Sequence, residues 1–218
     1  MKGLKEYKKE IIISMLFTML PAFVGLILWN RLPDAIPTHF NIRGEADQYS
    51  SKLFTVLFLP AYLLVIDCIG IFAAFNDPKK ENISRKIFAL VLWITPLVSL
   101  YVSYLIYGKA LNYDIDVTKI SLLLVGIVFL IVGNYLPKCR QNYTIGIRTP
   151  WALNDQDNWD KTHRFGGYVS IVCGFLMIIY AFVSSKANIY LLFIIIICVS
   201  VSPLLYSYFL YKKKQHLG

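Results

Sequence analysis

The fold is decided where the apolar sequence is interrupted, and the longest interruption is residues 137–167, PKCRQNYTIGIRTPWALNDQDNWDKTHRFGG. This stretch holds two of the four Trp residues, one of the three His and five of the 22 Lys and Arg. Apolar runs of about membrane length precede and follow it. Its mixture of cations, aromatic rings, amides and turn residues predicts a built site between two membrane spans.

The rest of the chain has the composition of an integral membrane protein. Hydrophobic residues make up 57% of its 218 residues and charged residues 16%, against about 25% charged in soluble domains. The apolar residues fall into runs of roughly 20, long enough to cross a ~30 Å hydrocarbon layer. We expect an all-α polytopic protein with six transmembrane helices in a bundle, at residues 11–30, 53–75, 87–107, 120–137, 166–184 and 188–211.

The basic residues predict the orientation of these spans. With the N-terminus inside, 16 Lys and Arg lie in the inner segments and six in the outer ones, so both termini are expected in the cytoplasm. The basic start MKGLKEYKKE resembles that of a signal peptide, but its apolar run is too long, so we expect a retained span. The formal net charge of +9 follows from these flanking residues, and no direct nucleic-acid binding is expected.

Catalysis and metal binding find little support. None of the four Cys residues forms a Cys-x-x-Cys pair, so neither a disulfide framework nor a zinc cluster is predicted. Gly-x-Ser-x-Gly, His-Glu-x-x-His, Walker and Gly-x-Gly-x-x-Gly patterns do not occur. His163 with Asp160 fits acid–base work in principle, but no nucleophile accompanies them. We expect no enzyme activity, no cofactor and no metal.

A second polar segment, residues 32–52, lies on the predicted outer side. Its prolines favour extended conformations in the residues before them, and Gly44 supplies a turn. His39, Glu45 and Asp47 then crowd a short polar region. Three interpretations stay open: a contact surface for a peptide or another partner, a metal site on these three side chains, or a compact loop held by its own hydrogen bonds.

Two of the polar residues in the predicted spans form a candidate pair, one of them the sole acidic residue well inside a span. Asp67 and Asn134 each lie 14 residues from the outer start of their span, so both side chains are expected at a similar depth. An ionised carboxylate there is costly, and Asp67 is therefore expected to be protonated or partnered. We predict a hydrogen bond between the two side chains, with a proton relay through Asp67 as the alternative.

The inner polar stretch offers a denser set of candidates. Arg148 is a bidentate donor suited to carboxylate or phosphate. Asn154 or Asp155 is expected to cap a helix on which Trp159 and His163, four residues apart, share one face. That helix is predicted to continue into the fifth span. Its aromatic and basic residues fit either anchoring at the lipid interface or a cytoplasmic docking or gating surface.

Both polar segments resemble known families. LPDAIPTHFNIRGEADQYSSK, residues 32–52, resembles DUF1648, a membrane domain whose hallmark is a Pro–His-Phe/Trp-Asn–Gly–Asp–Ser-Lys loop. GNYLPKCRQNYTIGIRTPWALNDQDNWDKTHRFGG, residues 133–167, resembles the hallmark of the SdpI family of bacterial membrane proteins. The positions that fit this second pattern are Asn134, Pro137, Asn142, Gly146, Arg148, Thr149, Pro150, Trp151, Trp159, His163 and Gly166.

The resemblance implies a multi-pass protein of the bacterial cytoplasmic membrane that binds or neutralises a secreted killing peptide. It also implies a receptor role, in which the protein holds a small transcriptional repressor at the membrane. Residues 1–86 would be the DUF1648-like segment with two spans, and residues 87–218 the SdpI-like segment with four spans and the cytoplasmic loop 138–165. A small proton-coupled transporter or channel using Asp67 is the alternative function.

The expected partners are thus the lipid bilayer, a toxin peptide outside and a repressor inside. The candidate ligand- and partner-binding residues are His39, Asn41, Gly44, Asp47, Asn142, Gly146, Arg148, Thr149, Pro150, Trp151, Trp159 and His163, with Asp67 and Asn134 as the intramembrane polar pair.

Overall fold

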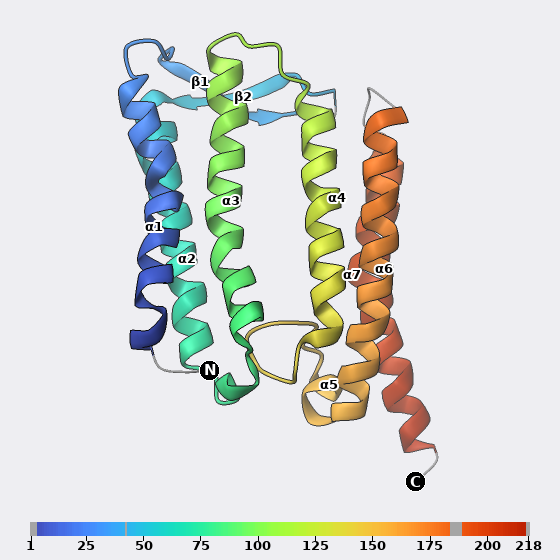
Figure 1. Cartoon of the computed structure of the whole chain (residues 1–218). Helices are drawn as coiled ribbons and strands as arrows, with labels where there is room; N and C mark the ends of the chain where they lie inside the picture. Colours follow the sequence, from blue (N-terminus) through green and yellow to red (C-terminus); the bar gives the residue numbers. More distant parts are fainter. Residues whose placement is uncertain (1–3, 42, 184–188, 217–218) are drawn as a thin grey trace. The chain divides into compact units, whose positions relative to one another are not determined.

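The computed structural model describes residues 4–41, 43–183 and 189–216. Six of its helices are long and apolar enough to cross a membrane, which confirms the predicted polytopic helical class (Figure 1). They are α1 (Leu4–Ile27), α2 (Leu59–Phe75), α3 (Arg85–Ala110), α4 (Val117–Tyr135), α6 (Gln156–Val183) and α7 (Ile189–Gln215). A π-helical turn, Phe54–Phe58, leads into α2. Helix α5 (Pro150–Asn154) is a short helix in residues 136–155, the polar loop between α4 and α6.

The helices divide into two compact units. The first comprises Met1–Asn76 and Arg85–Val117, and the second comprises Asp77–Ser84 and Thr118–Gly218. Helix α3 therefore packs with α1 and α2, although residue 87 was expected to begin the second sequence segment. The division at residue 86 stays a prediction about sequence families, whereas the units describe packing.

Aromatic and hydroxyl side chains join the three helices of the first unit. Tyr7 of α1 and Phe75 of α2 both pack edge-on against Phe88 of α3, with ring centroids 4.9 and 5.3 Å from that of Phe88. Further along, the Ser99 hydroxyl of α3 donates to the Thr18 carbonyl of α1 at 2.8 Å. The ring contact and this hydrogen bond link α1 and α3 at two levels. The bond also gives the buried Ser99 hydroxyl a partner, which buried polar groups need.

The predicted outer loop of the first unit is a β-hairpin. Strands β1 (Ala35–Phe40) and β2 (Ala46–Ser51) pair antiparallel, and the register shifts on both sides of His39. Ile36 of β1 is fully buried in a cluster with Leu32, Val56 and Ile106. This apolar anchor fixes the hairpin on the end of the helices where α1 finishes (Figure 1).

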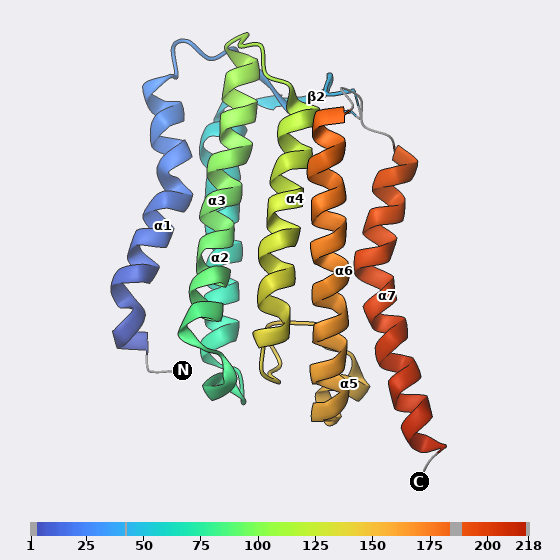
Figure 2. The ribbon, with the colours of Figure 1, turned by 45° about the vertical axis from the view of Figure 1, so that its right-hand side comes forward.

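In the second unit, α4, α6 and α7 lie side by side (Figure 2). Helix α6 packs on α7 around a buried core of Cys173, Met177 and Ile195. Helix α4 approaches α6 through two glycine pairs, Gly126 with Gly174 and Gly133 with Gly167. A Cβ on any of the four would lie within 3.0 Å of the facing carbonyl oxygen. Small residues of this kind let membrane helices approach closely.

Helix ends differ from the predicted spans where polar residues continue a helix beyond the membrane. Helix α6 begins at Gln156, ten residues before the predicted span, and α7 runs to Gln215, past its three lysines. Both extensions carry polar side chains that hydropathy does not assign to a span. They bring the end of α7 to the polar loop, which is where the candidate site lies.

Candidate functional site

The polar loop of the second unit is built on a buried Trp–His stack. Trp159 and His163 of α6 are both buried, with ring centroids 4.0 Å apart and nearly parallel planes. The Trp159 indole nitrogen donates to the Cys139 carbonyl at 2.8 Å. The backbone N–H of Ile147 donates to His163 Nε2 at 3.0 Å. One face of α6 thus carries both rings, as the four-residue spacing predicted, and in the structure these rings hold the loop at its start and its middle.

These bonds fix the chemical state of His163. Because Nε2 accepts a hydrogen bond from a backbone amide, this nitrogen carries no proton. Nδ1 lies 2.8 Å from the Trp159 carbonyl and so donates its proton to that oxygen. A neutral imidazole with the proton on Nδ1 is a structural group here, and neither nitrogen is free to accept or deliver a proton.

Gly146 makes the close approach to His163 possible. Its φ of 114° lies in the region that favours glycine. A Cβ at this position would lie 2.4 Å from His163 Nε2 and 3.2 Å from Trp159 Cζ2. The glycine of the Gly-x-Arg-Thr-Pro-Trp motif is therefore required by packing against the Trp–His stack.

Asn142 shapes the turn before this glycine. Its side-chain oxygen accepts from the backbone N–H groups of Thr144 and Ile145 at 2.9 and 2.6 Å, and its amide donates to the Arg140 carbonyl. Asp77 supports the same turn from a distant part of the chain. Its carboxylate accepts from the Tyr143 N–H at 2.8 Å and from the Thr144 hydroxyl at 2.6 Å.

Gln141 ties the turn to α5. Its side-chain amide donates to the Ala152 and Leu153 carbonyls, both at 2.9 Å, which belong to the last turn of that short helix. The Gln141 side-chain oxygen accepts from the Lys79 ammonium, and its backbone carbonyl accepts from the Asn82 amide. Residues of the segment 77–84, which precedes α3, thus hold the polar loop through hydrogen bonds.

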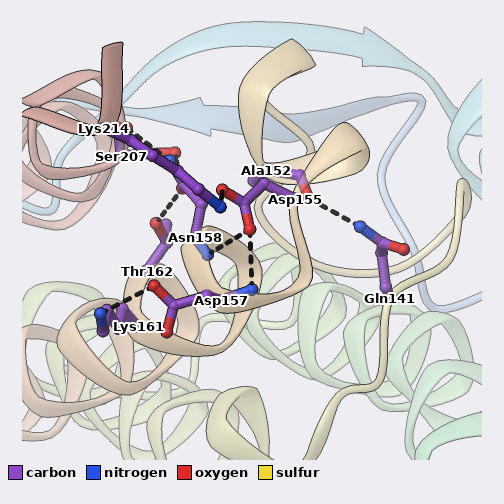
Figure 3. A network of polar contacts seen from close by, with 9 residues as sticks. All are labelled: Gln141, Ala152, Asp155, Asp157, Asn158, Lys161, Thr162, Ser207 and Lys214. Atoms are coloured by element: carbon purple, nitrogen blue, oxygen red, sulfur yellow. Dashed lines mark hydrogen bonds and ion pairs between the residues drawn. The ribbon is translucent and has the colours of Figure 1, made fainter. Parts of the chain in front are cut away.

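A second network joins the loop to α7 (Figure 3). The Ser207 hydroxyl donates to the Asn158 side-chain oxygen at 2.6 Å, and the Thr149 hydroxyl contacts the same Ser207 hydroxyl at 2.8 Å. Asn158 also donates to the Ser207 carbonyl and accepts from the Thr162 hydroxyl. All four side chains are buried, so the network lies in the interior of the unit.

Asp155 closes this end of the site. One carboxylate oxygen accepts from the N–H groups of Asp157 and Asn158 and caps α6, and the other accepts from the Lys214 ammonium at 2.7 Å. The hydrogen bond from Lys214 holds the pKa of this carboxyl below its usual range, and the two backbone N–H groups act in the same direction. The predicted cap is confirmed, while its link to α7 was not foreseen.

Three side chains of the motif face outward or lie at the surface. Arg148 and Pro150 are exposed, and the Arg148 guanidinium donates to the Tyr143 carbonyl at 2.7 Å. Trp151 is half-buried between Tyr208 and Tyr211 of α7. Within the described part of the chain its buried indole N–H has no hydrogen-bond partner. Arg148 is thus the exposed motif residue with further N–H donors to offer a partner, whereas the Trp151 N–H is enclosed within the protein.

The hairpin candidates form a separate group in the first unit. His39 Nδ1 and an Asp47 carboxylate oxygen lie 2.5 Å apart on facing strands, both partly exposed. The Asn41 side-chain oxygen accepts from the Arg43 and Glu45 N–H groups, and Gly44 has a φ of 76°. Asn41 also binds the Glu45 carboxylate, so these residues build the turn and leave His39 and Asp47 on its surface.

Among the described residues no group of three His, Cys, Asp or Glu side chains is placed to hold a metal ion. Glu45 is engaged by Asn41, whereas His39 pairs with Asp47. The hairpin therefore presents one His–carboxylate pair at its surface.

The intramembrane pair has partners within the two units. Asp67 of α2 is buried and accepts from the Ser14 hydroxyl of α1 at 3.1 Å, with Thr95 of α3 as a further hydrogen-bond partner. Asn134 accepts from the Lys138 ammonium at 3.3 Å. The predicted bond between Asp67 and Asn134 would join the two units and stays a prediction.

Sequence reasoning missed much of the frame around the polar loop. The missed residues lie in four different parts of the chain, and each reaches its partners only through the fold of the second unit. They are Asp77, Gln141, Asn158 and Ser207. Asp77 gave one local signal, since Asp before Pro78 favours a turn. Nothing in the sequence marks Ser207, which lies within an apolar span.

Residues 138–207 match the model of the SdpI/YfhL protein family, and residues 16–64 match the model of DUF1648, a domain of unknown function. This part of the chain is similar to the SdpI/YfhL protein family. The first match begins at the polar loop and ends at Ser207, so it contains α5, α6 and α7 as far as Ser207. The six apolar helices and these similarities make this a multi-pass membrane protein of bacteria.

A named relative is "Immunity protein SdpI" of Bacillus subtilis (strain 168). It is 29% identical over 209 residues, which cover 94% of this chain and 97% of that protein. The similarity therefore covers nearly the whole chain. No solved structure matches the chain.

Proposed function

We propose that this protein, which is similar to the SdpI family, is a membrane immunity protein that binds or neutralises a secreted antimicrobial peptide. The observation that carries the proposal is the similarity over 94% of the chain to a protein named for immunity. Immunity to a peptide needs a protein that lies in the threatened membrane and offers it a contact surface. The hairpin and the spans next to it provide such a surface.

The order of the spans supports different partners for the hairpin and the polar loop. Because successive spans cross the bilayer in opposite directions, the hairpin after α1 and the polar loop after α4 face opposite compartments. The basic residues favour the polar loop inside. The hairpin, with His39 and Asp47 on its surface, then meets the extracellular peptide.

The polar loop is the proposed contact for a cytoplasmic partner, a small transcriptional repressor. Its buried residues are held by hydrogen bonds. The exposed Arg148 guanidinium has further N–H donors for acceptors on another protein, and the half-buried Trp151 ring offers an apolar contact. Recruitment that depends on the peptide requires two states of the protein with different affinities for it.

Survival of a deletion strain exposed to secreted killing peptides tests the immunity proposal. Wild type is expected to restore survival. Asp47→Ala should lower it, while Asp34→Ala, which removes another exposed hairpin carboxylate, should not. Arg148→Ala should keep survival and lose capture of the repressor. Failure of wild type against every peptide in a broad panel contradicts the proposal.

The same strains test a proton-coupled transporter that uses Asp67. Its buried carboxylate, bonded to hydroxyls of two neighbouring helices, is the observation that favours this second function. A transporter should fail when a protonophore collapses the proton gradient and when Asp67→Asn is introduced. A binding protein at normal abundance should keep its affinity for the peptide in both cases.

A further inference from the structure

A polar pocket of about 390 Å³ lies at the end of the second unit, apart from the Trp–His stack and the Arg148 surface. Its walls come from the segment after α4, the first turns of α6 and the segment before α3. They consist of Asn82, Pro137, Arg140, Gln156, Asp160 and Arg164. Apart from Asn82, whose amide donates to the Gln141 carbonyl, their side chains take no part in the contacts that hold the polar loop.

The pocket has the chemistry of a site for one negative charge. Arg140 and Arg164 are both exposed, and the contacts of the described residues give neither guanidinium a partner. Asp160 supplies one carboxylate, which accepts from the Gln156 amide at 2.9 Å. Two guanidinium groups and one carboxylate leave one net positive charge. A phosphodiester carries one negative charge and matches the planar fork of Arg.

The position of the pocket indicates where the phosphate comes from. Pro137 follows the last turn of α4, and Arg164 lies two turns into α6, so the pocket lies where these helices leave the membrane. The side of α6 that carries Arg164 continues with Tyr168 and Phe175, which are 71% and 54% exposed. Phe175 is 11 residues further on, about 16 Å along the helix, or half of a ~30 Å hydrocarbon layer.

We propose that this pocket binds the headgroup of a phospholipid, with Arg140 and Arg164 holding the phosphate. The acyl chains then run along the exposed side of α6 past Tyr168 and Phe175. Asp160 accepts a hydrogen bond from the hydroxyl or ammonium group of the headgroup. Phosphatidylglycerol and phosphatidylethanolamine offer such donors, whereas phosphatidylcholine does not.

Native mass spectrometry of the purified full-length protein tests this site, with short-chain phosphatidylglycerol, phosphatidylcholine and inorganic phosphate as probes. Phosphatidylglycerol should bind the wild type more tightly than either other probe. Each Arg→Gln change should weaken its binding roughly fivefold, and the double variant Arg140→Gln, Arg164→Gln by more than tenfold. Arg164→Lys keeps the charge but loses the fork, so it should bind more weakly than wild type and better than Arg164→Gln.

Lys161→Gln is the matched control, because it removes a positive charge from the same turns of α6 outside the pocket, where Lys161 pairs with Asp157. It should change lipid affinity by less than twofold. An equal loss in this control would assign the effect to general surface charge and overturn the proposal. Unchanged binding by the double variant would also overturn it. Inorganic phosphate binding as tightly as the lipid would assign the pocket to free phosphate instead.

Discussion

Gly146 is the residue at which the polar loop is most sensitive to a single methyl group. With a φ of 114° and a Cβ only 2.4 Å from His163 Nε2, Gly146→Ala must strain the backbone and push the loop off the Trp–His stack. We expect a loss of about 2 kcal/mol or more in the free energy of unfolding. Denaturant or thermal unfolding of the purified protein in detergent measures this loss.

Gly70 in α2 offers the matched control, because a Cβ there meets no atom within 4 Å. Gly70→Ala should be neutral or stabilise by up to about 1 kcal/mol, since alanine suits a helix interior better. Equal effects of the two changes would mean that Gly146 is not held against His163.

Single residues also show how far the site could be read from the sequence. The shared face of Trp159 and His163 was predictable because four-residue spacing in a helix is local information. The link from Asp77 to Tyr143 spans 66 positions, and the link from Asn158 to Ser207 spans 49. Contacts at such separations depend on which helices pack together, and one sequence does not state that.

At the scale of helices, the ion pair between Asp155 and Lys214 joins the start of α6 to the end of α7. Asp155→Asn should keep the helix cap but lose the ion pair, costing about 0.2–1 kcal/mol near neutral pH. Asp155→Ala should cost roughly 1 kcal/mol more, because it removes the cap as well. Unfolding of each variant, with Lys213→Ala as a neighbouring charge control, separates the two contributions.

The pH dependence of this pair has a definite sign. The folded-state pKa of Asp155 is lowered, so its stabilising contribution is present above the ordinary carboxyl pKa of about 3.9 and is lost as the pH falls through the folded value. The stability difference between wild type and Asp155→Asn should therefore disappear in acid. A difference that persists below both pKa values would show that the charge of Asp155 is not its cause.

The glycine pairs between α4 and α6 carry a second prediction at this scale. A Cβ on Gly167 would lie 2.7 Å from the Gly133 carbonyl and 2.9 Å from Pro137. Gly167→Val should force the helices apart and cost about 1–3 kcal/mol. Membrane abundance and unfolding temperature report the change, with Gly70→Val as the comparison. If both variants behave alike, the close approach of α4 and α6 is wrong.

Hydropathy predicted the six helices because the bilayer itself imposes their length. Hydropathy placed the span ten residues inside α6, since the first turns of this helix are polar or aromatic, as at Trp159 and His163, and pack within the protein. The cap predicted at Asn154 or Asp155, on a helix that continues into the fifth span, located the actual start. The hairpin was expected only as extended residues and a turn. Its pairing depends on Ile36 reaching an apolar cluster on α3, which no local pattern in residues 32–52 reveals.

At the scale of the whole chain, the proposed function depends on which side of the membrane each polar region faces. One added cysteine per variant reports this with a membrane-impermeant thiol reagent. The added cysteine lies in the hairpin (Arg43→Cys), in the segment before α3 (Glu81→Cys) or at the end of α7 (Lys213→Cys). We expect labelling of the first in intact cells, and of the other two only after permeabilisation, because basic residues are retained inside. The parent protein with its four native cysteines sets the background labelling.

The pattern of labelling decides more than orientation. Labelling of Lys213→Cys but not Arg43→Cys in intact cells would show that the protein has the opposite orientation. The hairpin would then lie inside and could not meet a secreted peptide. Labelling of both would require an even number of crossings between residues 43 and 213. The six-span topology has five crossings there, so one of the spans would be wrong. Only the expected pattern places the His39–Asp47 pair outside, with Arg148 and Trp151 inside. Peptide contact and repressor capture both require that arrangement.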